Sequence, residues 1–201
     1  MSDSLSREEV LPRLRGRFGH EYRYVESTPS TQLLLSPDAP EGAVVVAGEQ
    51  TAGRGRLGRR WLAPAGTSLL CSVQLRPDVA GERLPELTGV AARACAEAVE
   101  ALTGLAAELK FPNDVLLDGR KTAGVLAEAR EDRVVLGIGV NVNVPAEQLP
   151  VEVEHPATSL LVETGRELDR GELLVELLER LERRYDDWHE RSRRDDIAAE
   201  P

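Results

Sequence analysis

The sequence predicts an α+β domain in which a mixed, largely antiparallel β-sheet is flanked by helices. Two observations favour this fold class. Short apolar segments follow one another closely between positions 108 and 142, and amphipathic helical patterns lie before and after them, at Leu84–Thr103 and Glu172–His189. A third observation argues against the common nucleotide-binding folds, because the chain has no Gly-x-Gly-x-x-Gly segment between a strand and a helix and no Walker-type loop.

The remaining elements can be placed in order along the chain. Residues 1–20 predict short helical turns interrupted at Pro12, and residues 191–201 predict a frayed polar tail. Between them we expect strands at Tyr22–Glu26, Ala43–Glu49, Thr67–Arg76, Glu108–Phe111, Val115–Leu117, Thr122–Ala129 and Arg133–Val142. The expected connections are a turn into a short helix at Ser27–Ser30, a glycine-rich loop at Thr51–Gly66 and a hairpin turn at Asp118-Gly119.

Composition limits the class of protein. The 201 residues suffice for one domain with a substantial core, and we expect residues 1–201 to form a single domain. The formal charge of −10 argues against non-specific binding of nucleic acid. No apolar stretch is long enough to cross a bilayer and no leader opens the chain, so we expect a cytoplasmic protein with no membrane partner. Cys71 and Cys95 lie among apolar residues and are expected to be reduced core residues.

The most specific segment is the basic loop Gly53–Arg60, which Trp61 follows directly. Its glycines let backbone amides turn toward an anion, and its guanidinium groups are bidentate donors for carboxylate or phosphate. Like charges on one loop repel each other, so we expect the loop to be mobile when empty and to become ordered around an anion. A solvated basic loop, an Arg-Gly contact to RNA and a core position for Trp61 are the alternatives.

Three further patterns carry chemistry. Among 25 basic residues only Lys110 and Lys121 are lysine, and they flank Pro112-Asn113-Asp114. Activating a carboxylate with a triphosphate joins two anions, so such a site needs positive charge and usually a metal ion. Glycines in the strand Gly137–Asn141 indicate close approach of a ligand. Chance placement of the lysines, a hairpin with surface charges and a bulged core strand are the competing interpretations.

In combination and in chain order, these segments resemble the motifs of biotin–protein ligases. The resemblance covers roughly residues 22–190. Residues 50–61 are similar to the family's signature loop, Lys110–Asp114 to its Lys-Trp-Pro-Asn-Asp, Lys121–Leu126 to its Lys-x-Ala-Gly-(Ile/Val)-Leu and Gly137–Asn141 to its Gly-x-Gly-x-Asn. Ser30-Thr31-Gln32 is similar to Ser-Thr-Asn, and Ala157–Leu160 matches a further segment.

The resemblance implies a fold and an activity. The fold would be the catalytic fold of biotin and lipoate protein ligases, which is related to class II aminoacyl-tRNA synthetases. The activity would be ATP-dependent formation of biotinyl-5′-AMP with Mg²⁺, followed by transfer of biotin to a lysine of a biotin carboxyl carrier protein. The implied partners are biotin, ATP and that carrier domain, and a homodimer is compatible with the resemblance.

The resemblance also implies roles for individual residues. Ser30, Thr31 and Gln50 would bind the ureido ring, and Lys121, Arg54, Arg56 and Asp114 would form the catalytic group. The biotin site would further include Gly53, Trp61, Gly124, Leu126, Gly137 and Gly139. The nucleotide side would comprise Arg56, Arg59, Trp61, Lys110, Asn113 and Asn141. For Asp114, magnesium binding and handling of the proton of the attacking lysine both remain open.

The sequence departs from the family pattern at several points. Gln32 replaces the expected Asn and is left outside the expected site, and Phe111 replaces Trp. The small C-terminal β-barrel usual in the family is not expected here, nor is an N-terminal DNA-binding domain, so DNA is not an expected partner. A lipoate–protein ligase or octanoyltransferase relative, and a biotin-binding domain with impaired transfer, are the alternative functions.

Overall fold

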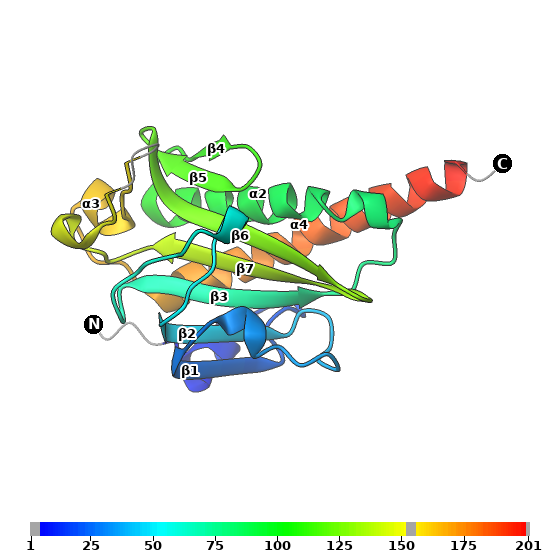
Figure 1. The fold of residues 1–201 in the computed structure, drawn as a ribbon, viewed down its shortest axis with the longest axis horizontal. Coiled ribbons are helices and arrows are strands. Elements are labelled where there is room, and N and C mark those ends of the chain that lie inside the picture. Colours follow the sequence, from blue (N-terminus) through cyan, green and yellow to red (C-terminus); the bar gives the residue numbers. More distant parts are fainter. Residues whose placement is uncertain (1–4, 152–155, 200–201) are drawn as a thin grey trace.

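The seven strands of the sheet follow the predicted pattern, and all but one pairing is antiparallel (Figure 1). The computed structural model describes residues 5–151 and 156–199. In spatial order β1-β2-β3-β7-β6-β5-β4, only β1 and β2 run parallel. The strands are β1 Tyr22–Thr28, β2 Val44–Gln50, β3 Ser68–Leu75, β4 Glu108–Lys110, β5 Asp114–Leu117, β6 Arg120–Arg130 and β7 Arg133–Asn141. The expected α+β class with a mixed, largely antiparallel sheet is therefore confirmed.

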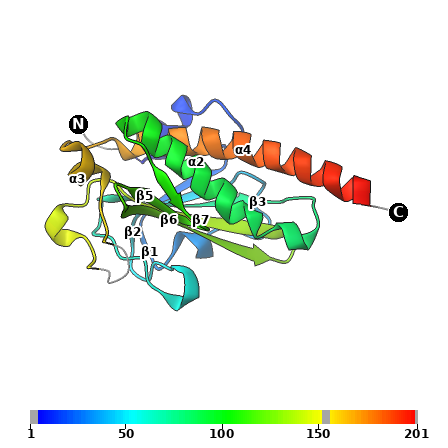
Figure 2. The ribbon, with the colours of Figure 1, turned by 90° about the horizontal axis from the view of Figure 1, so that it is seen from above.

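Two long helices, α2 (Glu86–Thr103) and α4 (Arg170–Ala199), cover one face of this sheet (Figure 2). Their apolar sides meet alternate residues of the central strands in one continuous core. Gly104 ends α2 in the left-handed conformation, with φ of 73°. The other helices are short: α1 (Arg7–Val10), α3 (Leu160–Thr164) and five 3-10 turns at Leu11–Arg13, Thr31–Leu33, Arg56–Gly58, Gly81–Arg83 and Ala146–Gln148.

Among the described residues, no long helix covers the opposite face of the sheet. The segment after β1 crosses it and buries a smaller apolar cluster of Leu35, Ala39, Ala43, Val45 and Val135. The remainder of this face, over β3, β7 and β6, is crossed by the loop between β2 and β3 (Figure 1). This loop is the basic loop of the sequence. None of the helices in the described part of the chain combines the length and apolarity that a bilayer crossing requires.

Two expected elements are wrong at their ends. The tail from Arg191 is helical as far as Ala199, the last described residue, because the loop after β3 supports it: Arg83 pairs with Asp195 at 3.1 Å and the amide of Ala80 donates to Asp196. The strand expected to stop at Glu26 continues to Thr28, because parallel pairing with β2 runs on to Gln50.

The turns between strands are mostly as predicted. Asp118 and Gly119 both have positive φ, 48° and 70°, as expected for a tight hairpin turn between β5 and β6. The sequence pattern did not predict α3. Its N-cap is Ser159, whose Oγ accepts a bond from the amide of Val162 and donates one to the carbonyl of Val144.

The two cysteines are free and buried in the core, as expected. Burial raises the pKa of the Cys95 thiol to about 12 and that of Cys71 further, and only a thiolate attacks disulfide reagents readily. We therefore expect neither thiol of the native protein to react with an aromatic disulfide reagent at pH 8, and both to react in denaturant. Absorbance of the released thiol measures this, and rapid labelling of one thiol before unfolding would contradict the buried placement.

Candidate active site

A pocket lies on the open face of the sheet, and the alternation of side chains along β7 creates its floor. Ile138 and Val140 of this strand point into the helix-covered core. Neighbouring residues of a strand point to opposite faces, so Gly137, Gly139 and Asn141 face the other way. This arrangement places two residues without side chains at the centre of the open face.

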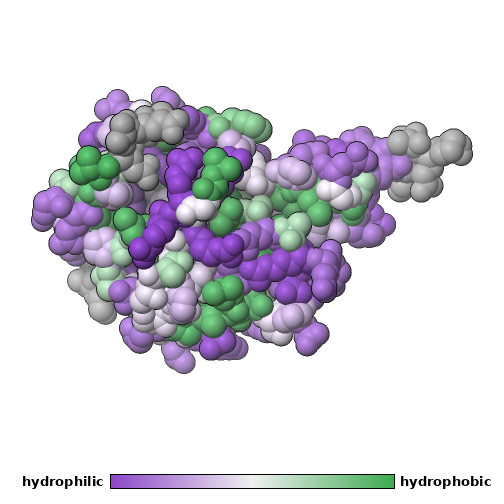
Figure 3. Space-filling view, viewed as in Figure 1, coloured by the Kyte–Doolittle hydropathy of each residue, from purple (hydrophilic) through white to green (hydrophobic). Residues whose placement is uncertain are grey.

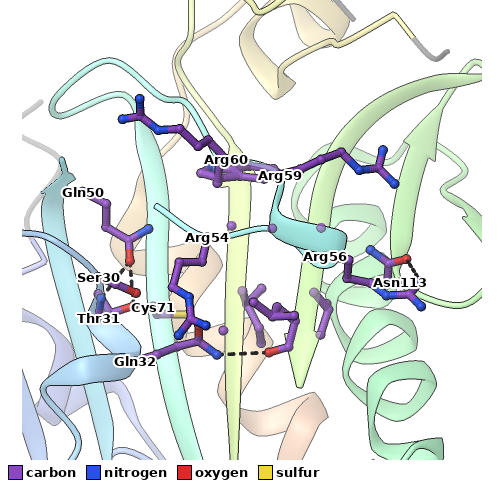
Figure 4. Close-up of a pocket in the computed structure, with 18 of the residues that line it drawn as sticks. Ser30, Thr31, Gln32, Gln50, Arg54, Arg56, Arg59, Arg60, Cys71 and Asn113 are labelled. Atoms are coloured by element: carbon purple, nitrogen blue, oxygen red, sulfur yellow. Dashed lines mark hydrogen bonds between the residues drawn. The ribbon is translucent and has the colours of Figure 1, made fainter. Parts of the chain in front are cut away.

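The pocket brings most of the expected residues together (Figure 4). Those lining it are Ser30, Thr31, Gln50, Arg54, Arg56, Arg59, Trp61, Asn113, Asp114, Lys121, Gly124, Leu126, Gly137 and Gly139. Asn141 lies in a smaller adjoining pocket that also contacts Trp61 and Lys121. Gly53 is buried against Trp61 and Gln50 and lines a neighbouring hollow beside the loop. Lys110 lies opposite Asp114 in the β4–β5 register, outside the lining of these pockets.

One end of the pocket is polar and almost fully buried. Ser30 and Thr31 are each 2% exposed. The amide and hydroxyl of Thr31 both donate to Oε1 of Gln50, at 2.8 and 3.0 Å, and its hydroxyl also lies 2.7 Å from that of Ser72. Because the oxygen of Gln50 accepts these bonds, its amide nitrogen remains a donor. Such an end suits a ligand with a polar head group that both donates and accepts.

Trp61 covers the glycine floor from above. A Cβ atom added to Gly139 would lie 2.6 Å from Cε2 of the indole, and one added to Gly124 would lie 3.1 Å from Cζ3. The indole Nε1 is buried and has no hydrogen-bond partner among the described residues. The ammonium of Lys121 lies 5.7 Å from the ring centroid, within the range of a cation–π contact. The ring therefore occupies the space that the glycines leave.

The opposite end of the pocket is charged. Nζ of Lys121 lies 3.1 Å from Oδ1 of Asp114, and both side chains are 17% exposed. The amide nitrogen of Asn113 donates to the same carboxylate at 2.8 Å, while Oδ1 of Asn113 accepts a 2.9 Å bond from Arg56. The neutral side chain of Asn113 and the anionic side chain of Asp114 thus connect Arg56 of the basic loop to Lys121 of β6.

The segment that contains Ala157 fixes the backbone of Lys121. The amide of Lys121 donates to Pro156, and the amide of Thr158 donates back to the carbonyl of Lys121 at 2.8 Å. The carbonyl of Thr158 also accepts a 3.0 Å bond from the side chain of Asn141. The Ala157–Leu160 match of the sequence is thus a short bridge that holds the lysine and the end of β7 in place.

The basic loop is a small hairpin. The amide of Gly55 donates to Arg59, and the amide of Trp61 donates to Gly53 at 3.0 Å. At its tip Leu57 has φ of 58°, a left-handed conformation that non-glycine residues adopt at some energetic cost, and its side chain is 87% exposed. Arg56 ties the loop to Asn113 in the β4–β5 turn, and Arg54 ties it to Glu128 of β6 at 2.8 Å.

Sequence reasoning missed several residues of the site. Gln32, which was left out, is 3% exposed and lines the pocket; its amide packs on Gly137 and donates a long bond of 3.4 Å to the carbonyl of Leu126. Arg60 also lines the pocket. The adjacency of Gln32 to Ser30-Thr31 was the available signal, because all three begin the same 3-10 turn. Phe111, by contrast, is 89% exposed at the β4–β5 turn.

The fold and the pocket together define a class of protein. A polar buried end, a floor of glycines and a cationic opposite end fit a small molecule that has a polar head and an anionic tail. The model of the Biotin/lipoate A/B protein ligase family matches residues 24–144. This chain belongs to that family.

Similar proteins agree with this membership. Over 173 residues the chain is 42% identical to the biotin–[acetyl-CoA-carboxylase] ligase of Mycobacterium tuberculosis, covering 82% of this chain and 64% of that protein. It is 40% identical over 179 residues to the bifunctional ligase/repressor BirA of Bacillus subtilis, covering 85% of this chain and 55% of that protein. This chain thus spans little more than half the length of the Bacillus relative.

Solved structures extend the comparison. The biotin protein ligase from Aquifex aeolicus in complex with biotin and ATP superposes with a TM-score of 0.78 and 36% identity, over 86% of this chain and 73% of that chain. The catalytic fold of this family is therefore the fold of this chain.

Gly139→Ala should displace the indole of Trp61, because the new methyl group would overlap the ring. In a Trp188→Phe background Trp61 is the only tryptophan, so its fluorescence reports the displacement. We expect a red-shifted emission maximum and stronger quenching by acrylamide. Gly89→Ala is the matched control, since a Cβ at Gly89 meets nothing within 4 Å. An unchanged spectrum in the Gly139 variant would mean that the ring does not rest on this floor.

Proposed function

We propose that this chain is the catalytic unit of a biotin–protein ligase, which forms biotinyl-5′-AMP from biotin and ATP and transfers biotin to a lysine of a biotin carboxyl carrier protein. The observation that carries the proposal is the polarity of the pocket. Ser30 and Thr31, both buried, and half-buried Gln50 lie at one end, and Lys121, Asp114 and Arg56 lie at the other. The names of the relatives in Mycobacterium and Bacillus support the same activity.

In this proposal the buried end of the pocket binds the ureido ring of biotin. The ring has both N–H donors and a carbonyl acceptor, and each buried polar group left without a partner would cost about 1–3 kcal/mol. Ser30 and Thr31 offer hydroxyl groups there, and Gln50 offers its amide nitrogen. Gly137 and Gly139 would let the apolar rings of biotin lie directly on the strand backbone, with Leu126 and Gln32 as walls.

The charged end would bring the two anionic substrates together. Arg54, Arg56 and Lys121 would neutralise the biotin carboxylate and the α-phosphate of ATP. Arg59, Asn113 and Asn141 would contact the nucleotide, with Asn141 reached through the pocket that adjoins Trp61. Lys110 would act from outside the pocket lining. It lies opposite Asp114 in the antiparallel pairing of β4 and β5.

A magnesium ion fits this site only as a partner of the phosphates. Among the described residues, no three His, Cys, Asp or Glu side chains gather as a metal site. Magnesium in triphosphate sites commonly uses one or two carboxylates and takes its other oxygens from substrate and water. Asp114 would hold the ion, which would supply charge neutralisation of the phosphates. Handling of the proton of the attacking lysine stays the second role proposed for Asp114, which lies 3.1 Å from the ammonium of Lys121.

The two steps balance with these residues. A carboxylate oxygen of biotin attacks the α-phosphorus of ATP, a new C–O–P linkage forms, and the bond to pyrophosphate breaks. In the second step the amine of the carrier lysine attacks the acyl carbon, the amide forms, AMP leaves and the amine loses a proton. In this proposal Lys121 would stabilise charge on the α-phosphate in both steps.

A lipoate–protein ligase is the alternative within the family, since the family description includes both cofactors. The Gly-Arg-Gly-Arg-x-Gly-Arg loop and the relatives named for biotin favour biotin. Competition between biotin and lipoate for the protein, measured by calorimetry, separates these two functions.

Incubation with biotin, ATP, Mg²⁺ and a biotin carboxyl carrier domain is the direct test of the proposal. We expect mass spectrometry to detect one biotinyl group on the carrier, and release of pyrophosphate to precede it. Pyrophosphate release without carrier modification would favour a domain with impaired transfer. Neither product, under conditions in which a known ligase modifies the same carrier, would refute the ligase assignment.

Lys121→Arg should lower the rate of biotinyl-AMP formation by about a hundredfold or more, the scale of losing one transition-state contact. The ammonium is a compact charge beside Asp114 and Trp61, and a planar guanidinium would crowd Gly124, whose added Cβ would lie 3.5 Å from Cε of the lysine. Pyrophosphate release in the absence of carrier measures the rate. Arg120→Lys, at the neighbouring residue that pairs with Glu163, is the control. An unchanged rate in Lys121→Arg would transfer the role to another cation.

A further inference from the structure

Glu128 connects the basic loop to the wall of the pocket. Arg54 contacts both oxygens of this carboxylate, with Nη2 2.8 Å from Oε1 and Nη1 3.2 Å from Oε2. Arg130 donates to Oε2 from the other side at 2.8 Å. Arg130 also donates to the backbone carbonyl of Gln32 at 3.1 Å, and Gln32 directly follows Ser30 and Thr31 in the chain.

The position of Glu128 is set by strand geometry. Leu126, Glu128 and Arg130 alternate along β6 with Val125, which belongs to the helix-covered core, and with Ala127, which packs against it. Leu126 lines the pocket and also a neighbouring hollow beside the loop, and Glu128 lines that hollow but not the pocket. Arg54 lines both spaces and thus stands between Glu128 and the pocket. The figure shows its side chain reaching from the loop toward Gln32 (Figure 4).

We propose that Glu128 is a positioning residue for biotin. Arg130 holds its carboxylate in place, and this carboxylate orients the guanidinium of Arg54 at the mouth of the pocket. The inference rests on the proposed function. A guanidinium has five N–H donors, and a bidentate carboxylate engages only two of them. Arg54 therefore keeps donors for the carboxylate of biotin while Glu128 fixes its plane.

The charges around Glu128 support this role. The carboxylate lies between two guanidinium groups, and its side chain is only 20% exposed, whereas that of Arg54 is 47% exposed. Without the negative charge, Arg54 and Arg130 would repel each other across a neutral acceptor. The more exposed of the two, Arg54, would turn toward solvent, and the pocket would lose an oriented cation.

The test is the variant Glu128→Gln, which keeps the size of the side chain and one acceptor. We expect the dissociation constant for biotin without ATP, measured by calorimetry, to rise about tenfold, the scale of one charge-assisted hydrogen bond. The KM for biotin should rise in parallel while kcat stays within about twofold, because the lost contact stabilises ground state and transition state alike. Glu97→Gln, which breaks a bidentate pair with Arg184 between α2 and α4, is the matched control and should leave biotin binding unchanged.

A double-mutant cycle with Arg54→Ala separates positioning from a general structural effect. If Glu128 acts through Arg54, Glu128→Gln should weaken biotin binding in the unchanged protein and have no further effect in the Arg54→Ala protein. Equal losses in both backgrounds would overturn the inference. Tighter binding in Glu128→Gln would also overturn it, since the carboxylate would then compete with biotin for Arg54.

A second variant covers the case in which Glu128→Gln does not fold. Arg130→Gln removes the support of the carboxylate, and we expect a smaller loss of biotin affinity that also vanishes in the Arg54→Ala background. No biotin binding by the unchanged protein would refute the proposed function and this inference together. Biotin binding that neither Glu128→Gln nor Arg130→Gln alters would refute the inference alone.

Discussion

The strand β7 has to satisfy two opposite requirements, and the rest of the site depends on this constraint. Its helix-covered face carries Val134, Leu136, Ile138 and Val140, which anchor the core against α2 and α4. Its open face has to admit a side chain or a ligand against the backbone, so Gly137 and Gly139 occupy it. Glycines weaken a strand. Here β3 and β6 flank the strand along its length, and their hydrogen bonds hold it in register where side-chain packing is absent.

The electrostatic arrangement follows from the same floor. The chain has a formal charge of −10, yet cations crowd one end of this pocket. Local carboxylates balance some of them: Asp114 pairs with Lys121, and Glu128 pairs with Arg54 and Arg130. Each of these carboxylates comes from a strand of the sheet, whereas Arg54 and Arg56 come from the loop. The rigid part of the fold thus provides the fixed anions, and the loop provides cations that can exchange partners.

The sequence predicts the strands and the motif residues better than it predicts the contacts between residues that are far apart in the chain. The strand that contains Gly137–Asn141 and the Asp118-Gly119 turn are local signals, and both form where the sequence predicts them. Gln32 and Glu128 could not be assigned to the site, because their partners Gly137, Arg130 and Arg54 are distant in sequence or belong to other elements. The helical tail was missed for the same reason, since its support comes from the loop after β3. The division into domains and the functional roles of the residues stay predictions.

The position of Trp61 has a consequence for any ligand of this pocket. The indole lies on Gly139 and Gly124, the surface that the proposed function assigns to the rings of biotin, so ring and ligand compete for the same backbone. Moving the indole breaks no hydrogen bond of its Nε1, because this buried atom has no partner among the described residues. The loop that carries it is bonded mainly within itself, and it is tied to Glu128 of β6 through Arg54 and to Asn113 of the β4–β5 turn through Arg56. Both tied arginines are the residues expected to contact the anions. An anion that binds Arg54 and Arg56 would therefore act on the same two ties that place Trp61. Anion binding at the charged end and displacement of the indole from the glycines would then be coupled through this one hairpin.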